Sequence, residues 1–246
     1  SNNKGVSYMS ASDKINKAID KGMVTVNKKE PARKYLGASL LGRACGRQIQ
    51  YMWKNISPDK GRHLDGKILR IFRLGDKYED AAIEWFIKAG FKLKTEDKDG
   101  KQIGFTAVDD KVKGHIDGIL KDGPTDIKYP RIWECKSMNN KKYSYFQQCG
   151  VQSSHSQYYS QVQIYMHMLD IKKNPAILTG INKETGDMHH EEIIYNKEHA
   201  ESLVTKAEEI VKKTEEHKYM PRFTTNKLHF ECKYCSWQDR CWRTIE

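Results

Sequence analysis

Gly114-His115-Ile116-Asp117-Gly118 and Arg131-Ile132-Trp133-Glu134-Cys135-Lys136-Ser137 are the two segments that decide how this chain folds. Each segment sets one acid, Asp117 or Glu134, among apolar residues, and this pattern predicts a buried strand. Side chains alternate between the two faces of a strand, so Glu134 and Lys136 share a face and Cys135 points away from it. Acids without a function are uncommon in buried strands, so the two segments predict a functional site.

Asp117, Glu134 and Lys136 suit metal-assisted hydrolysis of a phosphodiester. Carboxylate oxygens bind hard divalent cations, and an ammonium group can position or activate the attacking water. Neighbouring acids repel each other unless a cation lies between them, so the pair itself favours a metal. The alternative interpretation is a solvated strand, since 30% of the residues are charged. The apolar neighbours of both acids favour the functional interpretation.

The composition indicates a polyanionic partner and no membrane attachment. The 246 residues carry a formal net charge of +11, which suits nucleic acid better than an acidic membrane, although solubility alone would also explain it. No apolar run approaches the roughly 18 residues of a membrane span, and no signal peptide is recognisable. We therefore expect a cytoplasmic protein, in which the six cysteines bind a metal or cluster rather than form disulfides.

Hydrophobic periodicity predicts a mixed α/β fold around a central sheet. We expect a short helix over 13–21, a helix from residue 40 with Ser39 as its N-cap, and a strong helix that ends at Gly90. Two further helices are expected over 156–169 and 198–217. The predicted strands lie near 91–96, 103–109, 112–121, 131–137, 175–182 and 187–195.

The order of these motifs resembles the PD-(D/E)XK nuclease superfamily, and in particular its RecB-like branch. The matching positions are Gly75 with Glu79, the 114–118 segment, Glu134-Cys135-Lys136, and Gln161 with Tyr165. The resemblance implies a restriction-endonuclease-like core, a central mixed β-sheet flanked by helices, over residues 39–246. Residues 1–38 would form a basic N-terminal segment.

The resemblance also implies roles for single residues. Glu79, Asp117 and Glu134 would bind Mg²⁺ or Mn²⁺ together with the Cys135 carbonyl, and Lys136 would be the catalytic lysine. Gln161 and Tyr165 would contact DNA or order the site. From its position alone, Glu79 is better explained as an ordinary first-turn acid that the helix dipole favours. His115 is a possible DNA or water contact, and a hydrogen-bonded strand histidine is the equal alternative.

Four cysteines suggest a second site. Cys232, Cys235 and Cys241 follow a C-x2-C-x5-C spacing, and Cys45 could supply a fourth thiolate. This arrangement resembles iron–sulfur RecB-like nucleases of the AddB type and of CRISPR adaptation, which implies a 4Fe–4S cluster that joins the two ends of the chain. Four thiolates also suit tetrahedral Zn²⁺, and the spacing does not separate the two.

The segment 139–155 is expected to be a loop that is mobile without DNA. Its lysines, Lys141 and Lys142, could follow phosphates, and its rings, Tyr143 and Tyr145, could stack on unpaired bases. An ordinary aromatic anchor explains the same residues nearly as well.

The preferred function is a metal-dependent exonuclease that acts on single-stranded or unwound DNA ends in recombination, replication or repair. A helicase, recombinase or integrase is a possible partner. The alternatives are a structure-selective endonuclease on the same fold and a non-catalytic DNA clamp with a structural zinc or iron–sulfur site. A reader of specific sequence is disfavoured, because helix-turn-helix and zinc-finger spacings are absent from the sequence.

Overall fold

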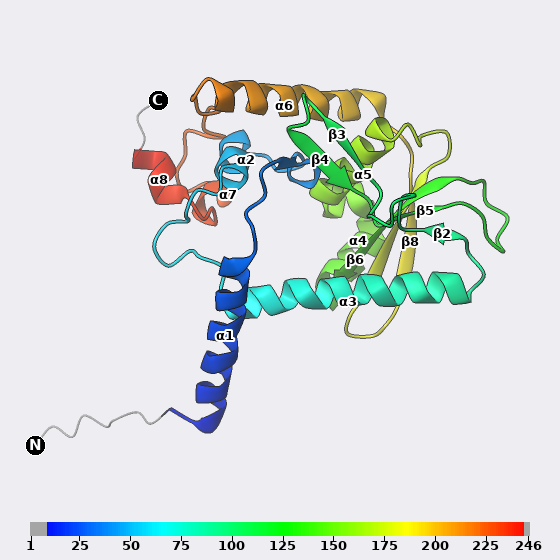
Figure 1. Ribbon diagram of the computed structural model, residues 1–246, viewed down its shortest axis with the longest axis horizontal. Helices are drawn as coiled ribbons and strands as arrows, with labels where there is room; N and C mark the ends of the chain where they lie inside the picture. Colours follow the sequence, from blue (N-terminus) through cyan, green and yellow to red (C-terminus); the bar gives the residue numbers. More distant parts are fainter. Residues whose placement is uncertain (1–8, 244–246) are drawn as a thin grey trace, which may run out of the picture.

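The computed structural model describes residues 9–243, and it confirms the mixed α/β fold (Figure 1). A five-stranded sheet has the order β2-β5-β6-β7-β8, in which β6 and β7 are parallel and the other neighbours are antiparallel. Its strands are β2 (Leu93–Lys94), β5 (Gly118–Leu120), β6 (Arg131–Met138), β7 (Ala176–Asn182) and β8 (Met188–Ile193).

Helices cover both faces of this sheet. Helix α3 (Gly66–Lys88) packs Ala82 and Phe86 against Trp133 and Cys135 on one face. The other face is covered by α4 (Asn140–Ser154) and α5 (Ser156–Met168), and α6 (Lys197–Glu215) packs outside α5. The N-terminal helix α1 (Ala11–Lys29) crosses α3 near the N-terminal end of α3 and extends away from the sheets (Figure 1).

A second, three-stranded sheet meets the first at Asp117. It has the order β1-β4-β3, with β1 (Leu36–Gly37), β4 (Val112–His115) and β3 (Gly104–Ala107). The sequence predicts one strand over 112–121, but the structure divides it into β4 and β5, which belong to different sheets. Asp117 lies in the break between them, where the chain passes from one sheet to the other.

Two helix starts and one helix end differ from the predictions. Ser39 lies in a 3₁₀ turn, η1 (Ala38–Leu40), and α2 (Gly46–Trp53) begins after Cys45, whose sulfur accepts the Gln48 N–H at 3.4 Å. Helix α3 begins at Gly66, well before the predicted region. Helix α1 runs through Gly22 to Lys29, because one exposed glycine costs a helix only about 1 kcal/mol.

The prediction of a loop over 139–155 is wrong. These residues form α4, whose N-cap Asn139 accepts the Lys142 N–H, and the chain bends only at Gly150, where φ is +72°. The segment contains few apolar residues at helical spacing, which explains the error. Tyr143 is 4% exposed and packs in the main core, so it is not free to stack on a base.

The C-terminal segment of the described chain packs against the region around α2, and not against the N-terminal helix α1 (Figure 1). Helices α7 (Phe230–Lys233) and α8 (Gln238–Arg243) pack against the segment that follows α2. The Trp237 indole N–H donates to the Ile56 carbonyl at 2.9 Å, and Asp59 accepts the Asp239 N–H at 2.6 Å. Across residues 9–243, no helix has the length and apolar content needed to cross a membrane.

Candidate active site

Asp117 and Glu134 lie side by side where the two sheets meet. The Asp117 backbone N–H donates to Glu134 Oε1 at 3.3 Å, and the Cys135 N–H donates to Asp117 Oδ2 at 2.8 Å. The pairing of Gly118 with Trp133 fixes this alignment. Asp117 is 9% exposed and Glu134 is fully buried, so two acids share a site with little access to water. The prediction of converging, buried acids is confirmed for this pair.

Lys136 is the cation beside these acids. Its Nζ lies 3.1 Å from Glu134 Oε2 and 3.9 Å from Asp117 Oδ2, so Glu134 and Lys136 share a face of β6 as the strand period predicts. Burial acts to lower the pKa of Lys136, but Glu134 and Asp117 outweigh it and hold that pKa well above its ordinary range. Lys136 is therefore an ammonium group that donates hydrogen bonds.

Glu79 belongs to the same electrostatic group. Burial, and then the Asp117 charge, raise the pKa of Glu79 to about 7, although Lys136 acts in the opposite direction. Burial and Asp117 also raise the pKa of Glu134 well above its ordinary value. Three acids from α3, the β4–β5 junction and β6 thus share the field of one ammonium. Because α3 begins at Gly66, Glu79 lies well inside the helix, and its interpretation as a first-turn acid is wrong.

Gln161 and Tyr165 extend the network from α5. The Gln161 amide nitrogen lies 3.2 Å from Glu134 Oε2 and 3.1 Å from the Tyr165 hydroxyl. Tyr165 approaches closely because residue 114 is glycine, whose Cβ would fall 3.0 Å from the Tyr165 ring and 2.4 Å from Phe105. Gln161 thus contacts Glu134, and Tyr165 contacts Gln161; both expected roles, DNA contact and ordering of the site, stay predictions.

Sequence reasoning missed Tyr158. Its ring centroid lies 5.6 Å from Lys136 Nζ and 5.3 Å from the centroid of the His155 ring, which is almost parallel to it. Tyr158 shares one face of α5 with Gln161 and Tyr165, at i, i+3 and i+7. That spacing was visible in the sequence and could have identified Tyr158 as part of the site.

The candidate DNA contacts lie in different surroundings. His115 is exposed at the end of β4, two residues before Asp117. Lys141, Lys142 and Tyr145 are exposed on α4, whereas Tyr143 is buried. The four exposed side chains remain possible contacts.

The donor set fits a hard divalent cation. Glu79, Asp117 and Glu134 offer carboxylate oxygens, and their mutual repulsion is what a cation would relieve. In the described part of the chain, no three His, Cys, Asp or Glu side chains are already grouped as metal ligands. Instead, one oxygen of Asp117 accepts the Cys135 N–H, and one oxygen of Glu134 accepts Lys136 and Gln161.

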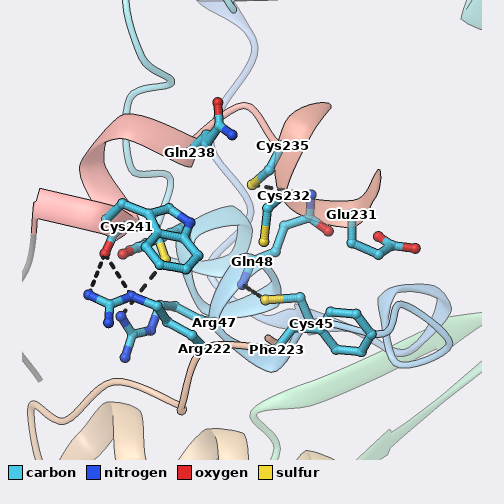
Figure 2. A pocket seen from close by; sticks show the side chains of 12 residues that line it. Cys45, Arg47, Gln48, Arg222, Phe223, Glu231, Cys232, Cys235, Gln238 and Cys241 are labelled. Carbon is cyan, nitrogen blue, oxygen red and sulfur yellow. Dashed lines mark hydrogen bonds between the residues drawn. The ribbon is translucent and has the colours of Figure 1, made fainter. Parts of the chain in front are cut away.

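The four predicted cysteines line one pocket at the junction of α2, α7 and α8 (Figure 2). Cys235 Sγ accepts the Trp237 N–H at 3.5 Å and the Gln48 amide at 3.7 Å, and Arg47 donates to Cys241 Sγ at 3.8 Å. Burial raises the pKa of the Cys232 and Cys235 thiols. The pocket therefore brings the thiols together, although they are not grouped at ligand distances within residues 9–243. Cys135 and Cys149 lie outside it.

Comparison with known proteins identifies the class of fold and site. The chain matches the PD-(D/E)XK nuclease superfamily over residues 38–242, so it belongs to that superfamily. Members of this superfamily generally use divalent metals such as Mg²⁺ or Mn²⁺. No curated protein is significantly similar in sequence.

Two solved structures share the fold at low sequence identity. One is SSO0001, with a TM-score of 0.53, 17% identity, and coverage of 94% of this chain and 98% of the other. The second is an alkaline exonuclease (LHK-Exo) from Laribacter hongkongensis, with a TM-score of 0.51, 10% identity, and coverage of 80% and 93%. At these identities the similarity establishes the fold alone.

Proposed function

We propose that this nuclease is a metal-dependent exonuclease that hydrolyses DNA at single-stranded or unwound ends. The observation that carries the proposal is the hydrogen-bonded group of Asp117, Glu134, Lys136 and Gln161, with Glu79 in the field of the same acids. The superfamily supports DNA as substrate, and the exonuclease among the structural neighbours favours action at ends.

Glu79, Asp117 and Glu134 would hold Mg²⁺ or Mn²⁺, and the Cys135 carbonyl is the fourth expected ligand. When bound, the cation supplies Lewis-acid stabilisation of the charge that develops on the scissile phosphate. Mg²⁺ and Mn²⁺ both accept all-oxygen sites, so the three carboxylates suit either.

The chain's own residues would orient the reactants. Because Lys136 is an ammonium, its role is to donate a hydrogen bond to the scissile phosphate or to the attacking water, and not to remove a proton in the resting state. Gln161 holds one oxygen of Glu134, which leaves the other oxygen on the Asp117 side. Tyr165 fixes Gln161 in that position.

The test is digestion of end-labelled linear DNA in Mg²⁺ or Mn²⁺ by the wild type and by Lys136→Ala. We expect Lys136→Ala to reduce the rate by about 10²-fold or more, as loss of one transition-state donor does. Lys98→Ala, which removes an exposed lysine on the β2–β3 connection, is the control and should digest at the wild-type rate. Equal rates for Lys136→Ala and wild type would remove the lysine from the mechanism.

Circular single-stranded DNA separates the alternatives. An exonuclease leaves a covalently closed circle intact, whereas a structure-selective endonuclease opens it. A non-catalytic clamp would bind both forms and cleave neither. Cleavage of the circle at a rate similar to the linear substrate would replace the exonuclease proposal with the endonuclease one.

We further propose that Cys45, Cys232, Cys235 and Cys241 ligate a 4Fe–4S cluster, with Zn²⁺ as the alternative. Their shared pocket and the N–H and amide donors near their sulfurs support a thiolate site. An absorption spectrum of freshly isolated protein decides: a broad band near ~400 nm supports iron–sulfur, and a colourless protein with stoichiometric zinc supports the alternative.

We also propose a role in recombination, replication or repair and a cytoplasmic location, as expected from the sequence. A helicase, recombinase or integrase that supplies the unwound end would be the corresponding partner.

A further inference from the structure

The outer face of the small sheet carries a compact group of cationic and aromatic side chains. Arg33 Cζ lies 5.8 Å and Lys113 Nζ lies 5.6 Å from the centroid of the Tyr35 ring. The His115 ring lies 6.4 Å from the same ring. We call these four residues the β4 face. Cation–π contacts at these distances hold the two cations in place beside one half-buried ring.

The β4 face lies next to the active site along the chain. Along β4, Val112 and Gly114 are buried, and Lys113 and His115 therefore share the opposite, accessible face. Ile116 is fully buried, and Asp117 follows it. Four residues of strand span about 13 Å, so Lys113 lies within a few nucleotides of a phosphate bound at Asp117.

Glycine at position 104 keeps this face open. Gly104 pairs with His115 across the β3–β4 ladder. A Cβ at Gly104 would lie 2.8 Å from His115 Cδ2 and 2.5 Å from the Gly114 carbonyl oxygen. A larger residue at position 104 would displace the imidazole, so His115 can occupy its present position because residue 104 has no side chain.

The charges of the β4 face lack carboxylate partners within residues 9–243. Lys111, two residues earlier, pairs with Glu215 at 2.6 Å, whereas no ion pair forms at Arg33 or Lys113 in that range. Cations held together without an anion repel each other, and a bound anion would relieve that repulsion. An imidazole ring offers at least one N–H donor in either protonation state.

We propose that the β4 face binds the backbone phosphates of the DNA strand whose scissile phosphate lies at Asp117 and Glu134. This inference rests on the proposed function and adds the path of the substrate. Arg33 and Lys113 contact phosphates, Tyr35 supports both cations, and His115 donates to the phosphate nearest the reacting one. Contacts of this kind are independent of base sequence.

The test measures binding of a fluorescent 20-nucleotide oligothymidine by anisotropy in EDTA, where no metal-dependent cleavage takes place. The variant is Arg33→Gln/Lys113→Gln in the full chain. The control is Lys172→Gln/Lys173→Gln, which removes the same charge from the exposed α5–β7 connection. Circular dichroism shows whether both proteins are folded.

We expect weaker binding by the β4-face variant and a smaller salt dependence. Each lost phosphate contact lowers the slope of log Kd against log salt by about 0.7 for a single strand, so two contacts lower it by about 1.4. Oligoadenosine should give the same loss. The control variant also loses two positive charges, but away from the proposed phosphate contacts. Its affinity and its salt slope should therefore stay close to those of the wild type.

The outcomes separate this inference from the proposed function. If the wild type digests DNA but both double variants bind alike, the β4 face is not the strand path, and the nuclease proposal stands. If the wild type neither binds nor digests DNA, the proposed function itself fails. A folded Tyr35→Leu variant with reduced binding, beside an unchanged Tyr35→Phe, would support the ring as the holder of the cations.

Discussion

The Glu79 carboxyl group is half-buried and lies within the electrostatic influence of Asp117. Both conditions change the pKa of Glu79. The pKa of Glu79 rises to about 7, because burial and Asp117 both disfavour the charged form. In the metal-free protein, the folded chain therefore keeps a proton at pH values where the unfolded chain has lost it. Stability falls as the pH rises through the interval from the ordinary value to about 7.

Glu79→Gln removes this penalty. In EDTA at pH 8 the variant should have a Tm higher than that of the wild type by a few degrees, roughly 2–6 °C. The difference should shrink as the pH falls toward 5. The control is Glu84→Gln, an exposed position on the same helix, which should show no such pH trend. A lower Tm for Glu79→Gln at pH 8 would mean that the carboxylate is stabilised by a contact other than those described.

Tyr158 is the second residue-scale test, since its ring lies beside the Lys136 ammonium. A cation–π contact of about 0.5–1 kcal/mol corresponds to about two- to fivefold in rate. Tyr158→Leu should lower kcat by that factor with little change in KM, and Tyr158→Phe should restore it. Steady-state digestion of a single-stranded oligonucleotide measures both constants. A Phe variant as slow as the Leu variant would assign the effect to the hydroxyl group.

At the scale of elements, β6, β7 and α5 could be predicted within one or two residues, because their apolar periods are strong and uninterrupted. Helix α4 could not, because its exposed lysines and the turn at Gly150 hide the period. The division of the predicted strand 112–121 into β4 and β5 could not be predicted either, because Ile116 and Asp117 continue the strand alternation. Only the pairing partners show that β4 and β5 belong to different sheets.

The site residues that share one strand could be predicted from the sequence, whereas those that come from a second element could not. Glu134 and Lys136 follow from the strand period alone. The approach of Glu79 and Tyr158 depends on how α3 and α5 cross the sheet, which no local pattern encodes. The resemblance to iron–sulfur nucleases predicted that the four cysteines lie close together, and all four do line one pocket.

The tail formed by α7 and α8 gives an element-scale prediction. Neither helix has a buried residue, and hydrogen bonds to Ile56 and Asp59 and the pocket of cysteines join the tail to the region around α2. Cys235→Ser should therefore increase cleavage by trypsin after the lysines and arginines of 227–243, while hydrogen exchange of β6 stays as in the wild type. Cys149→Ser, an exposed cysteine outside the pocket, is the control. Equal protection of the tail in both variants would show that the cysteines do not hold it.

At the scale of the whole molecule, α1 stands apart from the rest. None of its described residues is buried, and ion pairs of Arg70 with Asp20 and of Arg73 with Glu30 tie it to α3. Exposed ion pairs contribute about 0–1 kcal/mol each, and the helix adds little buried apolar surface. The expected division into a segment over 1–38 and a nuclease domain remains a prediction, and β1 pairing with β4 indicates that a truncation should end before Arg33.

Removal of residues 1–30 tests this division. The truncated chain keeps the acids, the β4 face and the cysteine pocket, so we expect a cooperative thermal transition within about 5 °C of the full chain and digestion of linear DNA at a similar rate. Ile15 and Ile19 are exposed, so the loss of α1 removes apolar surface from water without opening the main core. A folded truncation that has lost DNA binding would instead place α1 on the substrate path, since its lysines would then be the missing contacts. A truncation that does not fold would show that packing of α1 beside Gly66, where a Cβ would lie 2.3 Å from Asp20 Cα, contributes more than its exposure indicates.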